Sequence, residues 1–204
     1  MATTSTPYGL RPINLIGGQP YAGSTRAIKI ASGYASNLYT GQVVKIGSGG
    51  TLELVTETGG AADLFPAGTI GVFVGCSYTD ATMGTVHNQY WPTGQVAADA
   101  VGYVVDDPNA LFQVQADGAM LQADLGMNID FAAAQSTSTG STATGNSTSS
   151  VDASAVVATT GIGFRVVDFV ESDSSTVGDA YTDIIVKFNH GAHSYTNPVG
   201  TAAT

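Results

Sequence analysis

The sequence predicts an all-β protein whose strands form a barrel or a sandwich of jelly-roll-like form, with an extended N-terminal arm and at most one or two short helices. Short runs of alternating apolar and polar residues recur along the chain, and this period of two is typical of strands with one buried face. Glycine-rich turns separate the runs, since 26 of the 204 residues are Gly. A barrel or sandwich that closes on itself leaves no open strand edges.

The first half of the chain contains the clearest alternation. Residues 26–31 place two isoleucines on one face of a strand and a lysine on the other. Residues 43–46 and 51–55 flank the Gly-rich stretch 47–50. Because a short Gly-rich connection between two alternating runs is a hairpin signal, we expect these two strands to pair.

Further strands are expected around a proline turn in the middle of the chain. Residues 69–78 are almost continuously apolar or small, which indicates a strand buried on both faces. Residues 101–106 and 110–116 flank Asp107-Pro108-Asn109. Proline presets φ for a turn and asparagine tolerates tight backbone geometry, so we predict a second hairpin here.

The last part of the chain contains a strand pair and the best helix candidate. Residues 162–170 and 183–189 are separated by a polar loop, and we expect them to pair. Residues 120–131 are the helix candidate, but Gly126 interrupts an already poor periodicity. Any helix is therefore expected to be short.

Charge and composition divide the chain into an arm, a body and a tail. The first 52 residues carry four Lys or Arg and no carboxylate, while the remainder carries 16 carboxylates and two cations, a charge of 2 − 16 = −14. We expect residues 1–25 to form an extended arm and residues 26–195 a β-rich body. Within the body, the Ser/Thr-rich residues 135–150 predict a mobile surface loop, and residues 196–204 predict a loose tail.

Composition excludes several classes of partner. A net charge of −10 with only six Lys or Arg cannot supply the basic stripe that nucleic-acid binding needs. No apolar run approaches the roughly 18 residues of a membrane span, and the N-terminus has no signal-peptide pattern. We therefore expect no nucleic-acid or membrane partner, and synthesis in a cytoplasm.

The chain offers few arrangements for catalysis or metal binding. His190 and His193 have no Cys or carboxylate after them to complete a metal site, so we expect a surface loop. Asp106 and Asp107 are adjacent, and on a strand they would point to opposite faces, which does not suit an acid–base pair. Cys76 lies in an apolar run, which indicates a buried thiol. We predict that the protein is not an enzyme and has no catalytic residue, cofactor or metal.

The arm and an aromatic pair in the body are the expected partner-binding residues. Two prolines five positions apart favour an extended chain, and the apolar side chains of such an arm need a surface to pack on. That surface is either a neighbouring chain, with two arginines adding charge complementarity, or the protein's own body. The predicted partner-binding residues are Tyr8, Leu10, Arg11, Pro12, Ile13, Leu15, Ile16, Tyr21, Arg26, Tyr90 and Trp91.

Several short motifs follow one another in order along the chain. They are residues 6–12 (TPYGLRP), 16–26 (IGGQPYAGSTR), 75–78 (GCSY), 89–92 (QYWP), 106–108 (DDP) and 180–189 (AYTDIIVKFN). In this order the chain resembles virion structural proteins of tailed bacteriophages, most of all the capsid decoration, or cement, proteins. The resemblance implies a decoration-protein-like β fold.

The resemblance also implies a function and two partners. Such a protein decorates the outside of an icosahedral capsid and is often a homotrimer. It binds the major capsid protein and cements neighbouring coat subunits through its N-terminal arm and its trimer contacts. The expected location is the outer surface of the capsid, after synthesis in the host cytoplasm.

Two other functions stay open. The chain is alternatively a head-completion or tail component of the virion. It is otherwise a sugar-binding β-module on the virion surface, with Trp91, Tyr90 and Tyr78 as stacking platforms for the sugar rings.

Overall fold

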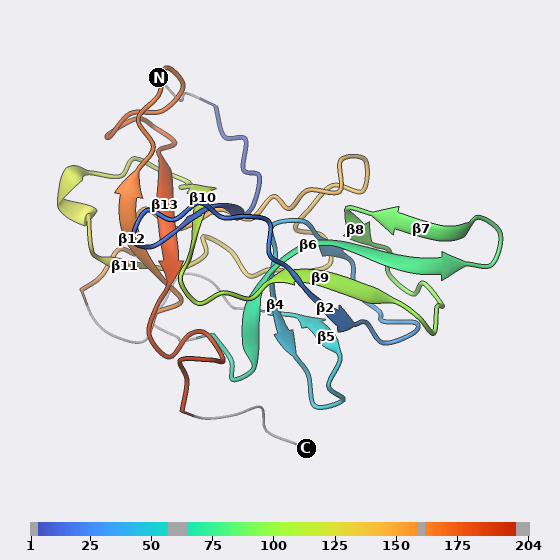
Figure 1. Ribbon diagram of the computed structural model, residues 1–204. Helices are drawn as coiled ribbons and strands as arrows, with labels where there is room; N and C mark the ends of the chain where they lie inside the picture. The colour runs from blue at the N-terminus through green and yellow to red at the C-terminus, as the bar shows by residue number, and fades with distance from the viewer. Residues whose placement is uncertain (1–3, 57–64, 159–161, 199–204) are drawn as a thin grey trace.

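The computed structural model describes residues 4–56, 65–158 and 162–198. Within these ranges the chain is all-β, as predicted, with antiparallel sheets and a single 3₁₀ turn (Figure 1). The elements are β1 (Arg11–Leu15), β2 (Arg26–Lys29), β3 (Leu38–Tyr39), β4 (Val43–Ile46), β5 (Leu52–Leu54), β6 (Thr69–Asp80), β7 (Gly84–Asn88), β8 (Tyr90–Trp91), β9 (Val101–Val105), β10 (Ala110–Gln115), η1 (Gln122–Asp124), β11 (Asn128–Ile129), β12 (Phe164–Phe169) and β13 (Asp183–Phe188).

One five-stranded sheet gathers strands from both ends of the chain. Its order is β1-β10-β13-β12-β11, and every neighbouring pair is antiparallel. The expected pairing of the last two long strands is confirmed, since β12 and β13 are neighbours. The N-terminal strand β1 forms one edge of this sheet. We call residues 4–25, the described part of the predicted arm, the leading segment, and through β1 it is part of the sheet.

The second sheet is built from residues 26–105 and curls into a small barrel. Its strands follow the order β2-β9-β6-β4-β5, and β7 pairs with the C-terminal half of β6. The predicted hairpin of β4 and β5 is confirmed. An isolated parallel bridge between Ile30 and Leu52 joins the two ends of this path. Gly102 of β9 faces the interior, where an added Cβ would come within 2.6 Å of Leu52 Cδ2.

The two sheets pack as a sandwich. Side chains alternate along the barrel strands β4, β6 and β9, so that these strands contribute to two cores. Val43 and Val105 belong to the core between the sheets, together with Phe112 of the five-stranded sheet. Their chain neighbours Val44 and Val104 belong to the core inside the barrel. Adjacent residues of β6 also enter different cores, so this strand is buried on both faces, as predicted.

The predicted hairpin at the proline turn is wrong. Strand β9 pairs with β2 and β6 in the barrel, whereas β10 pairs with β1 and β13 in the other sheet. The turn itself is present, because the Asn109 N–H donates to Asp107 Oδ1 at 2.7 Å and the Ala110 N–H to the Asp107 carbonyl at 3.0 Å. The turn residues predict that the chain changes direction, but they do not determine which strands pair. Here the two flanking strands pair with other strands, so the turn leads the chain from one sheet to the other.

The helix candidate is reduced to the single turn η1. Met120, just before it, is fully buried in the core between the sheets, whereas Leu121 and Leu125 on either side of the turn are exposed. The apolar side chains around the turn therefore do not share one buried face, which explains why no longer helix forms.

The Ser/Thr-rich segment 135–150 is tied to the body, where we predicted a mobile surface loop. The buried Gln135 side chain donates through Nε2 to the carbonyls of Val43 (3.2 Å) and Val55 (2.9 Å) and accepts the Val43 N–H at 2.9 Å. The Ser147 N–H donates to the Thr40 carbonyl at 2.8 Å. The surface placement is wrong for these residues, because amide and hydroxyl bonds supply the anchoring that apolar side chains would otherwise give.

Candidate functional site

The leading segment lies on its own body, which was the alternative to an arm laid across a neighbour. Leu10 is fully buried in the core between the sheets, with Phe112 and Val114 in the same cluster. Its N–H donates to the Gly41 carbonyl at 3.0 Å, and the Gly9 N–H donates to the Ser149 carbonyl at 3.2 Å. Strand β1 follows at once, so residues 9–15 are part of the folded unit.

A polar contact reinforces this attachment. The Tyr8 hydroxyl donates to Asp183 Oδ1 at 3.1 Å, and the Arg11 guanidinium carbon lies 4.1 Å from the centre of the Tyr8 ring. Burial raises the pKa of Tyr8, and the negative charge of Asp183 raises it further. Burial also raises the pKa of Asp183, while the bond from Tyr8 opposes that shift. The contact joins the leading segment to β13, near the other end of the chain.

The predicted partner-binding residues do not form one surface. Two of them, Leu10 and Trp91, are fully buried, so the prediction that they bind a partner is wrong. The three exposed residues are Arg11, Ile16 and Arg26. The half-buried residues are Tyr8, Pro12, Ile13, Leu15, Tyr21 and Tyr90.

The aromatic pair of the body is used for packing. Trp91 pairs in register with Leu38, and its ring meets the Tyr78 ring edge-on with centroids 5.3 Å apart. Tyr78 is only 5 % exposed. The Tyr90 ring stacks on Tyr39 at 5.8 Å. Trp91 and Tyr78 therefore present no ring face on which a sugar can stack, and that arrangement of a sugar site is corrected.

Arg26 is engaged within the molecule. It donates to the Tyr195 hydroxyl, and its Nη1 lies 3.6 Å from Asp106 Oδ2. The Tyr195 hydroxyl in turn donates to Asp106 at 3.0 Å. This cluster fastens the C-terminal segment to the barrel.

The predicted loose tail, residues 196–204, begins with two ordered residues, since Thr196 and Asn197 both donate to backbone carbonyls. Residues 199–204 lie outside the described residues.

His193 is buried, so its predicted place on a surface loop is wrong, whereas His190 is exposed. The His193 ring packs against the rings of Phe188 and Tyr195, with centroids 5.5 and 5.1 Å apart. The His193 Nδ1 accepts the Tyr195 N–H at 3.2 Å. Burial lowers the pKa of His193, and the Lys187 charge adds to the effect. The Ile70 carbonyl and the carboxylates of residues 106 and 107 oppose this shift. The imidazole is therefore neutral at neutral pH.

We expect the free energy of unfolding to fall with pH below about 6.5, the pKa of an unfolded histidine, because of His193. Since its pKa is lower in the folded protein, the unfolded state binds more protons in this window, and stability is lost as the pH falls. The measurement is urea unfolding of the parent and of His193→Gln at each pH.

The parent should lose stability relative to His193→Gln as the medium is acidified. The raised pKa of Asp183 acts with the opposite sign, but it is common to both proteins and cancels in the difference. A difference that does not change with pH would contradict the assignment.

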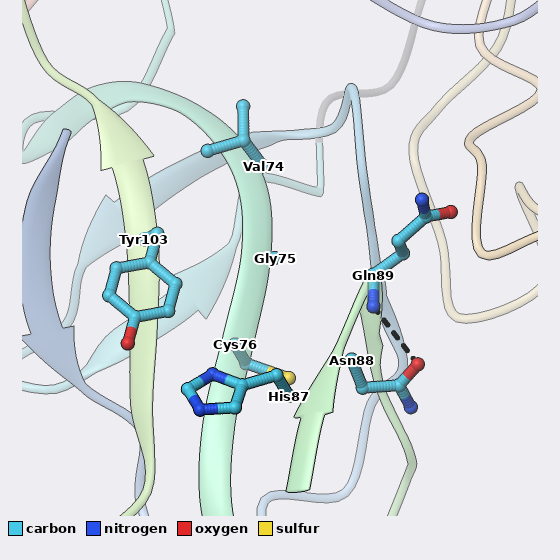
Figure 2. A pocket seen from close by; sticks show the side chains of 7 residues that line it. All are labelled: Val74, Gly75, Cys76, His87, Asn88, Gln89 and Tyr103. Atoms are coloured by element: carbon cyan, nitrogen blue, oxygen red, sulfur yellow. Dashed lines mark hydrogen bonds between the residues drawn. The ribbon is translucent and has the colours of Figure 1, made fainter. Parts of the chain in front are cut away.

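A shallow hollow lies on the barrel over Gly75 (Figure 2). Its volume is about 250 Å³, and the Tyr103 and His87 side chains flank it. The Cys76 thiol beneath donates to the Tyr90 carbonyl at 3.3 Å, and burial raises its pKa to about 12. The thiol is thus a buried, protonated packing group, as predicted, and not a nucleophile.

Within the part of the chain that the structure describes, no group of three or more His, Cys, Asp or Glu side chains is placed to hold a metal ion. In the same residues, no helix is long and apolar enough to cross a membrane.

No protein-family model, curated protein or solved structure matches this chain.

Proposed function

We propose that this protein is a structural protein of a tailed-phage virion, which decorates the outside of the icosahedral capsid and cements neighbouring coat subunits as a homotrimer. The proposal combines the resemblance of the sequence motifs to cement proteins with a β-sandwich body. Its partners are the major capsid protein and further copies of the same chain.

One observation carries the proposal: distant parts of the chain are bonded into a single unit. The N-terminal segment is bonded to residues 41 and 149. The Ser/Thr-rich segment is bonded to β4 and to the residue that follows β5, and the C-terminal segment to β2. A protein that holds a shell together has to transmit load through its body. Hydrogen bonds between distant segments suit this task, because they hold both ends of the chain on the body when load is applied.

The capsid-binding surface that we propose is residues 22–27, one exposed stretch that begins in the leading segment. It runs from the connection after β1 into the first two residues of β2, and both strands belong to the folded body. Arg26 is exposed here, although its charge is shared with Asp106. A segment that is attached to strands at both ends loses less conformational entropy on binding than a free arm does.

The test is cryo-electron microscopy of the purified virion. Density for this chain as trimeric knobs between coat subunits, with residues 22–27 against the coat protein, is the expected result. Density in the neck or the tail would overturn capsid decoration and favour the head-completion or tail alternative.

A binding experiment tests the proposed surface separately. We expect Ala22→Glu with Thr25→Glu to abolish binding to capsids that lack this chain, because two carboxylates would be buried against the coat. The matched control is Thr142→Glu with Ala143→Glu, which adds the same charge at two other exposed positions. Equal binding of both variants would show that residues 22–27 do not face the capsid.

A further inference from the structure

Two positive charges face each other on the five-stranded sheet. Arg165 and Lys187, the only Lys or Arg beyond residue 52, are register partners across β12 and β13. Like charges directly opposite each other destabilise a sheet. Neither side chain forms an ion pair with any carboxylate of the described ranges, and Arg165 Nε donates to the neutral Asn128 Oδ1 at 3.1 Å.

These two side chains lie in an open hollow of about 280 Å³. Ile16, His190 and Val167 also line it, and Ile16 is 49 % exposed. We call this site the basic hollow. It combines uncompensated positive charge with an exposed apolar side chain, which is the chemistry that receives an acidic segment with an apolar neighbour.

The two carboxylates in the strands of this sheet, Asp168 and Asp183, form no ion pair with the basic hollow. Asp183 accepts the Tyr8 hydroxyl at 3.1 Å. Asp168 lies opposite Ile185 in register and accepts the Phe169 N–H at 2.9 Å. The molecule as a whole carries a net charge of −10, so a site with two facing cations contrasts with the average charge of the chain.

The opposite end of the molecule carries the complementary charges. The β6–β7 hairpin projects away from the five-stranded sheet, and its turn forms the far edge of the molecule in Figure 1. Asp80, the last residue of β6, accepts the N–H groups of Thr82 and Met83 in this turn at 2.8 and 3.0 Å. These bonds lower the pKa of the Asp80 carboxyl, so it stays ionised.

A second carboxylate and two apolar side chains accompany Asp80. Asp99 accepts the N–H and the hydroxyl of Thr79 at 3.1 and 2.6 Å, which lowers its pKa. The Gln95 amide donates to Asp80 at 3.3 Å and holds the loop of residues 95–99 against the hairpin. Met83 and Val96 are 71 % and 75 % exposed. We call these four residues, Asp80, Met83, Val96 and Asp99, the acidic tip.

We propose that the acidic tip of one copy docks into the basic hollow of a second copy. Each surface contains apolar and charged side chains, and the charges of the two surfaces are opposite. The strands β12 and β13, which carry the hollow, lie at one end of the molecule in Figure 1 and the β6–β7 turn at the other, so a single chain cannot bring the two surfaces together. Copies with a net charge of −10 repel one another, and a contact through the two facing cations offsets part of this repulsion.

Such a contact is heterologous, because two different surfaces meet. Repeated head to tail, it closes into a ring when the rotation between copies allows it. In a closed ring every copy makes two contacts, so the ring is held more tightly than a dimer with a single contact. The inference supplies the copy-to-copy contact of the proposed trimer and to that extent rests on the proposed function, but it is tested without a capsid.

The experiment is sedimentation velocity of the purified full chain at about 0.05 M and about 0.5 M NaCl, where the screening length falls from above 10 Å to below 8 Å. We expect an oligomer at low salt that dissociates at high salt. Arg165→Gln with Lys187→Gln, the hollow variant, should weaken association at least about tenfold.

The matched control is Lys29→Gln with Lys45→Gln. It gives the same net charge as the hollow variant, −10 − 2 = −12, and leaves the basic hollow intact. We expect the control to associate like the parent. A parent that is monomeric at low salt, or a control that dissociates as much as the hollow variant, would overturn the proposal.

A mixing experiment tests the head-to-tail geometry. Asp80→Asn with Asp99→Asn, the tip variant, keeps an acceptor oxygen for the turn but removes both charges. The hollow and tip variants should each be monomeric, and their equimolar mixture should form one-to-one dimers, since one retains the tip and the other the hollow. A mixture that stays monomeric, with both variants folded by circular dichroism, would overturn the contact. Loss of capsid binding alone would bear only on the proposed function.

Discussion

Phe164→Ala should lower the free energy of unfolding by about 4 kcal/mol, the usual cost of truncating a buried phenylalanine. Phe164 is fully buried, and its ring lies 4.9, 5.2 and 5.3 Å from those of Phe65, Phe131 and Phe188. Removing it would empty the centre of this aromatic cluster, because three surrounding rings cannot collapse into the space. Urea unfolding followed by the fluorescence of the single Trp91 measures the loss.

Phe164→Leu is the matched control for the aromatic cluster. It retains most of the side-chain volume. Apart from the lost ring contacts, we expect it to lower the free energy of unfolding by less than about 1.5 kcal/mol. An alanine variant within about 1 kcal/mol of the parent would mean that the cluster is not a packed core.

Leu10→Ala should lower the free energy of unfolding by about 3 kcal/mol, as for other buried leucines. The residue is fully buried between the sheets, although it belongs to the segment that the charge pattern predicts to be an arm. The same urea titration applies. Ile16→Ala serves as the control, because Ile16 is 49 % exposed and should change stability by less than about 0.5 kcal/mol.

The comparison of these two variants also decides between two states of the leading segment. If Leu10→Ala were as stable as the parent, residues 4–15 would be detached in solution and free to reach another chain. A large loss places them permanently on the body, and deletion of residues 2–25 would then destabilise the fold itself instead of removing a dispensable clamp.

Local pairings could be predicted from the sequence, and distant ones could not. The β4–β5 hairpin was accessible because its Gly-rich turn and both strands lie within a dozen residues. The β9–β10 turn carried an equally clear signal, but each strand pairs with partners from other parts of the chain. Nothing local distinguishes a turn within a sheet from a turn between two sheets.

The candidate contact residues show the same limit. Tyr8, Leu10 and Arg11 are close in sequence, yet Leu10 is fully buried, Tyr8 half-buried and Arg11 exposed. These differences depend on how the segment pairs with β10 and packs against the rest of the body. Trp91 was equally ambiguous, since an aromatic residue suits an interface as well as a core. By contrast, the facing pair Arg165 and Lys187 could have been found, because both residues lie in strands that were predicted to pair.

The origin of the strands in each sheet has a consequence for synthesis of the protein. All strands of the barrel come from residues 26–105, whereas the five-stranded sheet needs β1, β10 and β13, from the start, the middle and the end of the chain. The barrel can therefore form while the ribosome is still translating. The other sheet has to wait until β13 (Asp183–Phe188) has been made, since chain closure over such separations is slow. Until then β1 can pair with β10, but the two strands remain without β13, which joins them to the rest of the sheet.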